Sequence, residues 1–181
     1  MSIKGVKLFN YYNATDSRGS FSKAFEFKEH DTNGFRGVKE IFSSRSNAGV
    51  WRGMHLQVGS FASNRIIYCN SGRAKDYLLD LRHNSSTLGE TMNIQFCSLQ
   101  YSSRAIFVPA GVAHGFLSEE NGTEIFYITD AIYSAEHDTG VNVFTTSIAN
   151  SLPSMELLDF SERDAQLLDY NEFLKYDYKY E

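Results

Sequence analysis

A stretch that begins at Trp51 carries residue types suited to acid–base chemistry at a short spacing. Arg52 and His55 stand three residues apart, and Gln57 follows two residues later. In an extended strand alternate residues share a face, so His55 and Gln57 are expected to point the same way as Trp51. Arg52 would point the opposite way unless the strand bends, and Gly53 makes a bend or a β-bulge easy to form. The stretch predicts a cationic anchor and a titratable imidazole beside one pocket; the competing interpretation is a surface arginine next to a structural core histidine.

A second histidine, His114, follows a turn of the Pro-x-Gly type. Residues 109–111 form this turn, and the histidine stands between Ala113 and Gly115, so its side chain is expected to enter a narrow space. Two histidines at strand ends after glycine-bearing turns are typical of a small barrel of the cupin type, in which two such motifs meet in one cavity.

Many cupins hold a metal ion in this cavity, but this sequence is not expected to do so. The usual motif has two histidines one residue apart, and here Gln57 takes the place of the second. Two histidines and an amide lack the three strong ligands that a catalytic transition metal needs. We therefore expect no metal.

Length and composition indicate one folded domain. The 181 residues are 42% hydrophobic and 14% aromatic, which supports a sizeable core, so a single domain is expected over residues 1–181. The net charge of -5 gives no basic surface for nucleic acid.

Cys69 and Cys97 stand alone, which indicates neither a disulfide framework nor a zinc site. The first residues lack the apolar core of a signal peptide and no apolar run approaches the ~20 residues of a membrane span, so a cytoplasmic protein is expected.

Short apolar and β-branched runs separated by turn residues dominate the chain, and this pattern predicts a β-sandwich or barrel. The expected strands cover residues 7–12, 38–42, 65–69, 74–81, 91–99, 104–108 and 123–131. The pair of strands around Gly72 has the signature of a β-hairpin, and residues 28–37 are expected to form a polar loop. In the tail, Ser161 and Asp164 form the Ser-x-x-acidic pattern that opens a helix. A short C-terminal helix and an arm, either packed or frayed, are expected over residues 155–181.

Taken in order, these motifs resemble those of the dTDP-4-dehydrorhamnose 3,5-epimerases, metal-free cupin-fold enzymes that act on nucleotide 4-keto sugars. The resemblance covers about residues 16–165. Its marks are Asp16-x-Arg18-Gly19, Arg52-Gly53-Met54-His55-Leu56-Gln57, Asp80-Leu81-Arg82 with Ser86-Thr87-Leu88-Gly89, Pro109-x-Gly111-x-Ala113-His114-Gly115-Phe116, Tyr127, Tyr133 and Arg163-Asp164. Each motif alone is weak, but their common order and spacing are specific. The family implies an all-β jelly-roll cupin, a homodimer, and catalysis without a cofactor.

The resemblance implies three catalytic positions. His55 matches the general base, Asp164 the carboxylate that orients and charges it, and Tyr127 the general acid on the opposite face of the sugar. A C4 ketone acidifies the hydrogens on C3 and C5, and a base such as histidine can remove one of them. The enolate oxygen then needs a hydrogen-bond donor. Return of a proton from the other face inverts the carbon.

The family further implies a set of residues that contact the substrate. Arg65 stands where the family usually has a lysine near the sugar oxygens, and it would donate to the enolate. Arginine binds phosphate bidentately, which suits the anion-contacting positions Arg18 and Arg52. The full set of expected binding residues is Arg18, Arg52, Gln57, Arg65, His114, Tyr133, Asp138 and Arg163. The N-terminal strand that bears Arg18 is expected to cross to the other subunit's pocket.

Structural interpretations stay open for several of these positions. Asp164 also stands where the acid of a capping box would reach back to its own helix start. Tyr127 lies in an apolar strand and would also fit the core, and Tyr133, near a strand end, fits either role. The remaining histidines, which are His30, His83 and His137, lie in polar loops and are expected to be solvated.

Some positions on the substrate-recognition side depart from the family pattern. The family often has Gln-Asp-Asn where this chain has Glu40-Ile41-Phe42. Lys23 replaces a usual acidic residue, and Ile128 replaces a lysine that often follows the acid tyrosine. The expected function is therefore epimerisation of a nucleotide-linked 4-keto-6-deoxy sugar at C3, with C5, the nucleotide and the sugar left open. The alternatives are a 3-epimerase only, a keto-isomerase, or a non-catalytic sugar-binding cupin. A bacterial polysaccharide pathway is an expectation from the family alone.

Overall fold

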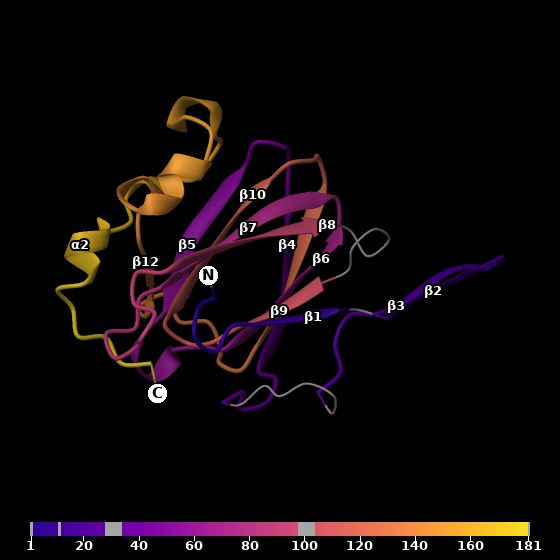
Figure 1. Cartoon of the computed structure of the whole chain (residues 1–181), viewed down its shortest axis with the longest axis horizontal. Helices are drawn as coiled ribbons and strands as arrows, with labels where there is room; N and C mark the ends of the chain where they lie inside the picture. Colours follow the sequence, from indigo (N-terminus) through magenta and orange to yellow (C-terminus); the bar gives the residue numbers. More distant parts are fainter. Residues whose placement is uncertain (1, 11, 28–33, 98–103, 181) are drawn as a thin grey trace.

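Two antiparallel sheets, stacked face to face, form the body of the protein in the computed structural model (Figure 1). The structure describes residues 2–10, 12–27, 34–97 and 104–180. The first sheet contains, in spatial order, β1 (Lys7–Asn10), β9 (Arg104–Val108), β6 (Arg65–Ser71), β11 (Thr123–Thr129) and β4 (Glu40–Ser46). The second contains β12 (Asp138–Gly140), β5 (Trp51–Gln57), β10 (Val112–Ser118), β7 (Arg73–Asp80) and β8 (Thr91–Cys97). A two-stranded ribbon of β2 (Tyr12–Asp16) and β3 (Gly19–Lys23) extends away from this body.

Short helices connect and cover the strands. The 3-10 helices are η1 (Gly59–Phe61), η2 (Val143–Thr145), η3 (Ser147–Ser151) and η4 (Met155–Leu157), and the α-helices are α1 (Glu162–Ala165) and α2 (Tyr170–Phe173). Within the described ranges, no helix has the length and apolar character needed to cross a membrane.

Alternation of side chains along the strands gives each sheet an inner face that meets the other sheet. Ile67 and Ile125 of the first sheet pack with Leu78 and Phe116 of the second in one fully buried cluster. The outer face of the second sheet is covered by the C-terminal segments, and Phe173 of α2 is buried there. The expected β-sandwich with a short C-terminal helix is confirmed.

The C-terminal tail is a packed arm rather than a frayed end. Tyr170, Tyr178 and Tyr180 pack against the cluster on the outer face of the second sheet. The helix expected at Ser161 is present but short, and the Ser161 hydroxyl accepts a hydrogen bond from the backbone N–H of Asp164 at 3.1 Å. That bond satisfies one of the free N–H groups at the helix start.

Most expected strands are present with small shifts of their ends. Residues 104–108 form β9 as expected, whereas the strand expected over residues 38–42 begins and ends later, as β4. Residues 28–33 of the expected polar loop, which include His30, and residues 98–99 of an expected strand lie outside the described residues.

The expected hairpin around Gly72 is wrong, because β6 and β7 belong to different sheets. Gly72 has a φ of 75°, and a Cβ atom at this position would lie 2.5 Å from Oγ1 of Thr123. The chain therefore turns tightly against β11 and crosses from the first sheet to the second. A cluster of turn residues does not distinguish a hairpin from such a crossing, because both require a tight turn.

A β-bulge sets the direction of the side chains on β5. His55 lies opposite His114 of β10, whereas Arg52 lies opposite Phe116, so β5 contains one extra residue between these two pairs. Because His114 and Phe116 share a face of β10, Arg52 and His55 also share the inner face. Gly53, which lies between Arg52 and His55, makes this bend in the strand possible.

Gly53 permits the bulge by letting two strands approach closely. Its φ is 129°, and a Cβ atom would lie 2.4 Å from Cα of Gly115. Trp51 points to the outer face, where its indole N–H donates to the carbonyl oxygen of Gly53 at 2.9 Å. The expectation that Trp51 shares a face with His55 is therefore wrong, since the extra residue reverses the alternation.

Replacing Gly53 tests how far the strand geometry depends on this close approach. In Gly53→Ala the added methyl group overlaps β10, so we expect the free energy of unfolding to fall by about 2 kcal/mol or more in denaturant titrations. Gly19→Ala is the matched control, because Gly19 has a similar φ of 125° but a Cβ atom there would meet nothing within 4 Å. Equal losses of stability in the two variants would contradict the close-approach explanation.

Candidate active site

Ionisable side chains meet at the centre of the space between the two sheets. His55 and His114 are direct register partners on β5 and β10, so their side chains lie side by side on the inner face. Asp76 of β7 lies on this same face, because it pairs with Phe116 of β10. Arg65 of β6 and Tyr127 of β11 face this group from the first sheet. The site is therefore assembled from strands of both sheets.

His55 and Asp164 form the first histidine–carboxylate pair. Nε2 of His55 lies 2.7 Å from Oδ1 of Asp164. The other carboxylate oxygen accepts the backbone N–H of Gly53 at 3.3 Å. The carboxylate thus contacts β5, and it also interacts with the hydroxyl of Ser161 at its own helix start, where that hydroxyl caps the backbone N–H of Asp164. A proton on Nε2 leaves Nδ1 of His55 as the nitrogen that accepts a proton from a ligand.

The surroundings of Asp164 favour its ionised form. Burial raises the pKa of this carboxyl, since a charge is costly in a poorly solvated place. The hydrogen bond and charge of His55, with the N–H of Gly53, outweigh burial, so the pKa of Asp164 lies below its usual range. The His55 side chain remains one-quarter exposed, at 25%. The imidazole is therefore oriented by a carboxylate yet accessible to a ligand.

His114 and Asp76 form a second pair that is almost completely buried. Nε2 of His114 lies 2.6 Å from Oδ2 of Asp76, and the two side chains are 4% and 0% exposed. Burial raises the pKa of Asp76, while the charge and hydrogen bond of His114 oppose that rise. The other oxygen of Asp76, Oδ1, has no hydrogen-bond partner among the described residues. This pair therefore offers an acceptor to the space between the sheets.

Arg65 brings a positive charge to the same space. One terminal nitrogen, Nη2, donates to the carbonyl oxygen of His55 at 3.0 Å, while Nε has no partner among the described residues. Burial lowers the pKa of this guanidinium, and the negative charges of Asp138 and Asp76 oppose the fall. Arginine stays charged through such shifts. Arg65 therefore has a donor ready for a ligand oxygen.

Tyr127 lies across the space from the histidines. Its side chain is 8% exposed, and its ring meets the ring of His114 edge-on, with centroids 5.7 Å apart. The ring of Phe42 stacks on its other side, with centroids 4.8 Å apart and an interplanar angle of 13°. Burial raises the pKa of the Tyr127 phenol, and the field of Asp76 raises it further. The phenol therefore keeps its proton at neutral pH.

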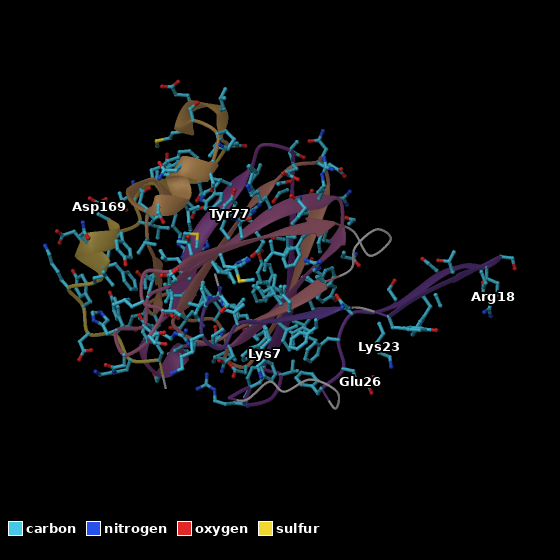
Figure 2. All side chains as sticks on the ribbon, viewed as in Figure 1. Lys7, Arg18, Lys23, Glu26, Tyr77 and Asp169 are labelled. Atoms are coloured by element: carbon cyan, nitrogen blue, oxygen red, sulfur yellow. The ribbon has the colours of Figure 1, made fainter. Side chains whose placement is uncertain are left out.

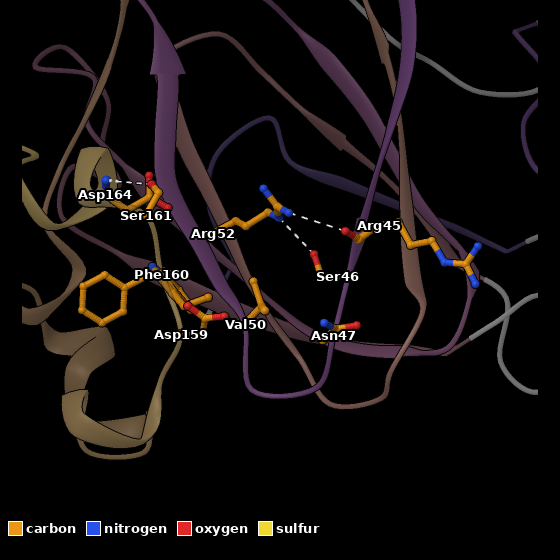
Figure 3. A pocket seen from close by; sticks show the side chains of 10 residues that line it. Arg45, Ser46, Asn47, Val50, Arg52, Asp159, Phe160, Ser161 and Asp164 are labelled. Atoms are coloured by element: carbon orange, nitrogen blue, oxygen red, sulfur yellow. Dashed lines mark hydrogen bonds between the residues drawn. The ribbon is translucent and has the colours of Figure 1, made fainter.

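Two openings flank this cluster along β5. A pocket of about 560 Å³ adjoins Arg52 and Asp164 and is closed on its far side by Asp159 and Phe160 (Figure 3). In this pocket Arg52 points toward β4, where it donates to the Ser46 hydroxyl at 2.9 Å (Figure 3). A smaller cavity of about 180 Å³ lies at the other end of β5, lined by Glu40, Phe42, Leu56, Gln57, Ser63, Arg65, Thr129, Ala131, Tyr133 and Asp138. The larger pocket thus reaches Arg52 and Asp164 at the start of β5, and the smaller one reaches Gln57 at its end.

The expected binding residues at the smaller cavity already make contacts within the chain. The amide of Gln57 donates to the carbonyl oxygens of Phe61 and Ile132 and accepts the N–H of Ser134. Gln57 thus holds two loops together. Arg163 and Asp138 pair with each other at 2.6 Å. Tyr133 is exposed at the rim.

Arg18 is the one expected binding residue that the structure places away from the site. It lies at the end of the ribbon of β2 and β3, far from the two sheets (Figure 2). Its guanidinium pairs with Asp16 at 2.6 Å and is largely exposed. Within one chain, Arg18 does not reach the cluster.

The sequence interpretation did not include Asp76 in the site, and it named Phe42 only among the recognition-side positions that depart from the family pattern. An aspartate inside the apolar run of β7 is a signal that was available, because a buried carboxylate usually has a specific partner. Nothing in the residue type of Phe42 marks it. Of the histidines expected to be solvated, His83 is exposed. His137 is only partly exposed, since its ring packs on Phe61 with centroids 4.5 Å apart. The described residues hold no cluster of three His, Cys, Asp or Glu suited to a metal ion.

Replacing the carboxylate of Asp164 tests its electrostatic role. Its pKa is lowered by folding, so ionised Asp164 stabilises the fold at pH above the unfolded value near 4, and this stabilisation is lost as pH falls through the lower folded value. We expect the difference in unfolding free energy between the native chain and Asp164→Asn to shrink steadily between about pH 5 and about pH 2 in urea titrations.

Asp177→Asn is the control for that series. Asp177 pairs with Lys179 at 2.6 Å, but both side chains are largely exposed, and exposed pairs contribute little to stability. Its difference from the native chain should stay near zero throughout. A difference for Asp164→Asn that does not change with pH would contradict the assignment of a stabilising, ionised carboxylate.

Comparison with known proteins agrees with the resemblance seen in the motifs. A profile of the dTDP-4-dehydrorhamnose 3,5-epimerase family matches residues 1–172. The dTDP-4-dehydrorhamnose 3,5-epimerase of Sinorhizobium fredii (strain NBRC 101917 / NGR234) is 34% identical over 169 residues, which are 91% of this chain and 85% of that protein. The enzyme of that name from Elizabethkingia anophelis NUHP1 superposes with a TM-score of 0.84 at 27% identity, covering 95% of this chain and 94% of the other. The Bacillus anthracis str. Ames enzyme, solved with TDP and PPi bound, gives a TM-score of 0.80 at 30% identity, covering 90% and 92%. The chain therefore belongs to the dTDP-4-dehydrorhamnose 3,5-epimerase family.

Proposed function

We propose that this protein is an isomerase that epimerises a nucleotide-linked 4-keto-6-deoxy sugar at C3, and at C5 if the second carbon also reaches the base. The observation that carries the proposal is His55 of the second sheet, paired with Asp164 of α1, together with the Tyr127 phenol on the first sheet. A sugar ring between the two sheets would have a base on one face and an acid on the opposite face. This is the arrangement that inversion of a carbon requires.

The first step removes a hydrogen from the carbon next to the ketone. Nδ1 of His55 takes the proton. The C–H electron pair forms a carbon–carbon double bond to C4, and the carbonyl electrons move to the C4 oxygen, which gives an enolate. The ionised Asp164 stabilises the imidazolium that forms, since opposite charges attract strongly where water is scarce. No electrons leave the substrate, so the step needs no oxidant or reductant.

The enolate oxygen is stabilised by a hydrogen-bond donor. Arg65 has an Nε–H with no partner among the described residues, lies within the buried cluster and carries a permanent positive charge. One well-placed donor of this kind contributes about 3 kcal/mol to stabilisation of a transition state. Oδ1 of Asp76, which accepts no hydrogen bond from the part of the chain that the structure describes, suits a sugar hydroxyl.

The second step returns a proton from the other face. The phenol O–H of Tyr127 breaks, a new C–H bond forms, and the ketone is restored with the carbon inverted. The raised pKa of Tyr127 keeps the phenol protonated before this step and makes the phenolate quick to recover a proton from water afterwards. The His55 imidazolium loses its proton to water in turn, so the acid and the base are both reset without a net change in protons.

The nucleotide end of the substrate requires cations. Arg52 faces the larger pocket and suits a diphosphate group. The relative from Bacillus anthracis, which was solved with TDP and PPi, binds such groups.

The proposal includes a homodimer in which the exposed ribbon, with Tyr12 and Phe21 uncovered, brings Arg18 to the site of the other subunit. A cytoplasmic location and a role in polysaccharide biosynthesis are proposed from the family alone.

A non-catalytic sugar-binding cupin is the main competing function. Such a protein would need the shape of the cavity but neither an oriented imidazole nor a buried phenol. A keto-isomerase also needs a base, but it moves the carbonyl group, so product NMR separates it from an epimerase. Inversion at C3 alone is separated in the same spectra.

His55→Ala in heavy water tests the base. With nucleotide 4-keto sugars as substrates, the native protein should introduce deuterium at C3, whereas the variant should do so about 10²–10⁴-fold more slowly, because the proton acceptor is gone. His83→Ala, an exposed histidine away from the cluster, is the control and should exchange at the native rate. Native-rate exchange in His55→Ala would overturn the assignment of the base.

Tyr127→Phe separates the acid from the base. Loss of the hydroxyl leaves deprotonation by His55 intact but removes the donor on the opposite face, so deuterium should enter the sugar while inversion falls by about 10²–10⁴-fold. Proton NMR of the sugar ring measures exchange and configuration in one sample. Inversion at the native rate would show that another group returns the proton.

A further inference from the structure

We propose that Phe42 is a positioning residue for Tyr127 and that its ring directs the phenol toward the carbon that is inverted. The inference rests on the proposed function for its catalytic consequence. It concerns a residue at which the chain departs from the usual sequence of its family, since an aromatic ring stands where that family often has an asparagine.

The contact between the two rings is built into the sheet. Phe42 and Tyr127 are direct register partners on the neighbouring strands β4 and β11. Their ring planes differ by 13° and their centroids are 4.8 Å apart, which is a stacked arrangement. His114 meets the same tyrosine ring edge-on. Rotation of the Tyr127 ring about its long axis would drive its edge into Phe42, so the stack fixes the plane of the phenol.

Phe42 also separates the phenol from solvent. Phe42 is 46% exposed, whereas Tyr127 beneath it is 8% exposed. Phe42 lines the 180 Å³ cavity together with Arg65 and Tyr133. Without the phenyl ring this cavity would extend to the face of Tyr127, and water could reach the acid. The stacked ring of Phe42 therefore both aligns the Tyr127 phenol and keeps water away from it.

Loss of this ring should change how the enolate is reprotonated. A misdirected phenol protonates the carbon slowly, and the His55 imidazolium then returns a proton to the face from which it came. That return restores the original configuration, although the hydrogen has been exchanged with solvent. The diagnostic quantity is the ratio of inverted product to exchanged hydrogen, which a general loss of stability would not lower.

The chain contains a matched control for this substitution. Phe126 is the neighbour of Tyr127 on β11 and stacks on Tyr68 of β6, with centroids 5.3 Å apart and an interplanar angle of 15°. This second stack lies on the outer face of the same sheet, so it resembles the first in geometry but does not reach the cluster. Phe126→Ala removes an equivalent stacked ring without touching the phenol.

The test compares Phe42→Ala, Phe42→Leu and Phe42→Tyr with Phe126→Ala in heavy water. We expect the inversion-to-exchange ratio to fall about tenfold or more in Phe42→Ala, to fall less in Phe42→Leu, and to stay within about twofold of native in Phe42→Tyr, which keeps the ring. Phe126→Ala should keep the native ratio even if it lowers the melting temperature. If Phe42→Ala does not fold, Phe42→Leu decides. A native ratio in every folded Phe42 variant that lacks the ring would overturn the proposal.

A second readout does not depend on catalysis. Tyrosine labelled with carbon-13, with the signal of residue 127 identified by its absence in Tyr127→Phe, reports the rate of ring flips by NMR. We expect flips of Tyr127 to be at least about tenfold faster in Phe42→Leu and unchanged in Phe126→Ala. If the native protein exchanges no hydrogen in any 4-keto sugar, the proposed function fails while this measurement still decides the positioning role. Unchanged flip rates in Phe42→Leu would overturn it.

Discussion

The hydrogen bond between His55 and Asp164 is the contact on which the arrangement of the site depends. It joins residues 109 positions apart in the chain. Two local features make it possible. The bulge at Gly53 turns His55 to the inner face and presents a backbone N–H to the carboxylate. The cap supplied by Ser161 starts α1 so that Asp164 points at β5. The C-terminal arm therefore completes the site, and its aromatic residues, packed over the second sheet, hold that carboxylate in place.

The two histidine–carboxylate pairs differ in solvent access, and this difference separates their roles. The His55 side chain is partly exposed, whereas that of His114 is buried. Both imidazoles use Nε2 for their carboxylate, but only the His55 side chain keeps appreciable exposure, at 25% against 4% for His114. A buried carboxylate such as Asp76 is costly unless it is paired, so the second pair suits a fixed acceptor facing the sugar. Arg65, which donates to the backbone of His55, offsets the negative charge of the buried Asp76.

The resemblance to a known family predicted the contact between His55 and Asp164, and the structure contains it. Residue types and spacing alone also fitted a helix cap for Asp164, so the local pattern did not decide between the two. The catalytic roles of both residues stay a proposal. The hairpin at Gly72 was wrong because turn residues specify a tight turn and not which sheet receives the next strand. Trp51 was placed on the wrong face because simple alternation does not account for a bulge, although Gly53 indicated where one could form. Phe42 was noted only as a departure from the family pattern, and its stack on Tyr127 could not be predicted because it depends on the residue opposite it on another strand. Arg18 lies away from the cluster in one chain, and its expected role remains a prediction.

The most direct test of the account is a crystal structure of the protein with an unreactive nucleotide sugar bound. The account predicts that C3 of the sugar lies about 3–3.5 Å from Nδ1 of His55, with the Tyr127 hydroxyl on the opposite face of the ring. It also predicts the C4 oxygen beside Nε of Arg65. A sugar that occupies only the outer part of the 560 Å³ pocket, or one with the imidazole and the phenol on the same face, would contradict it.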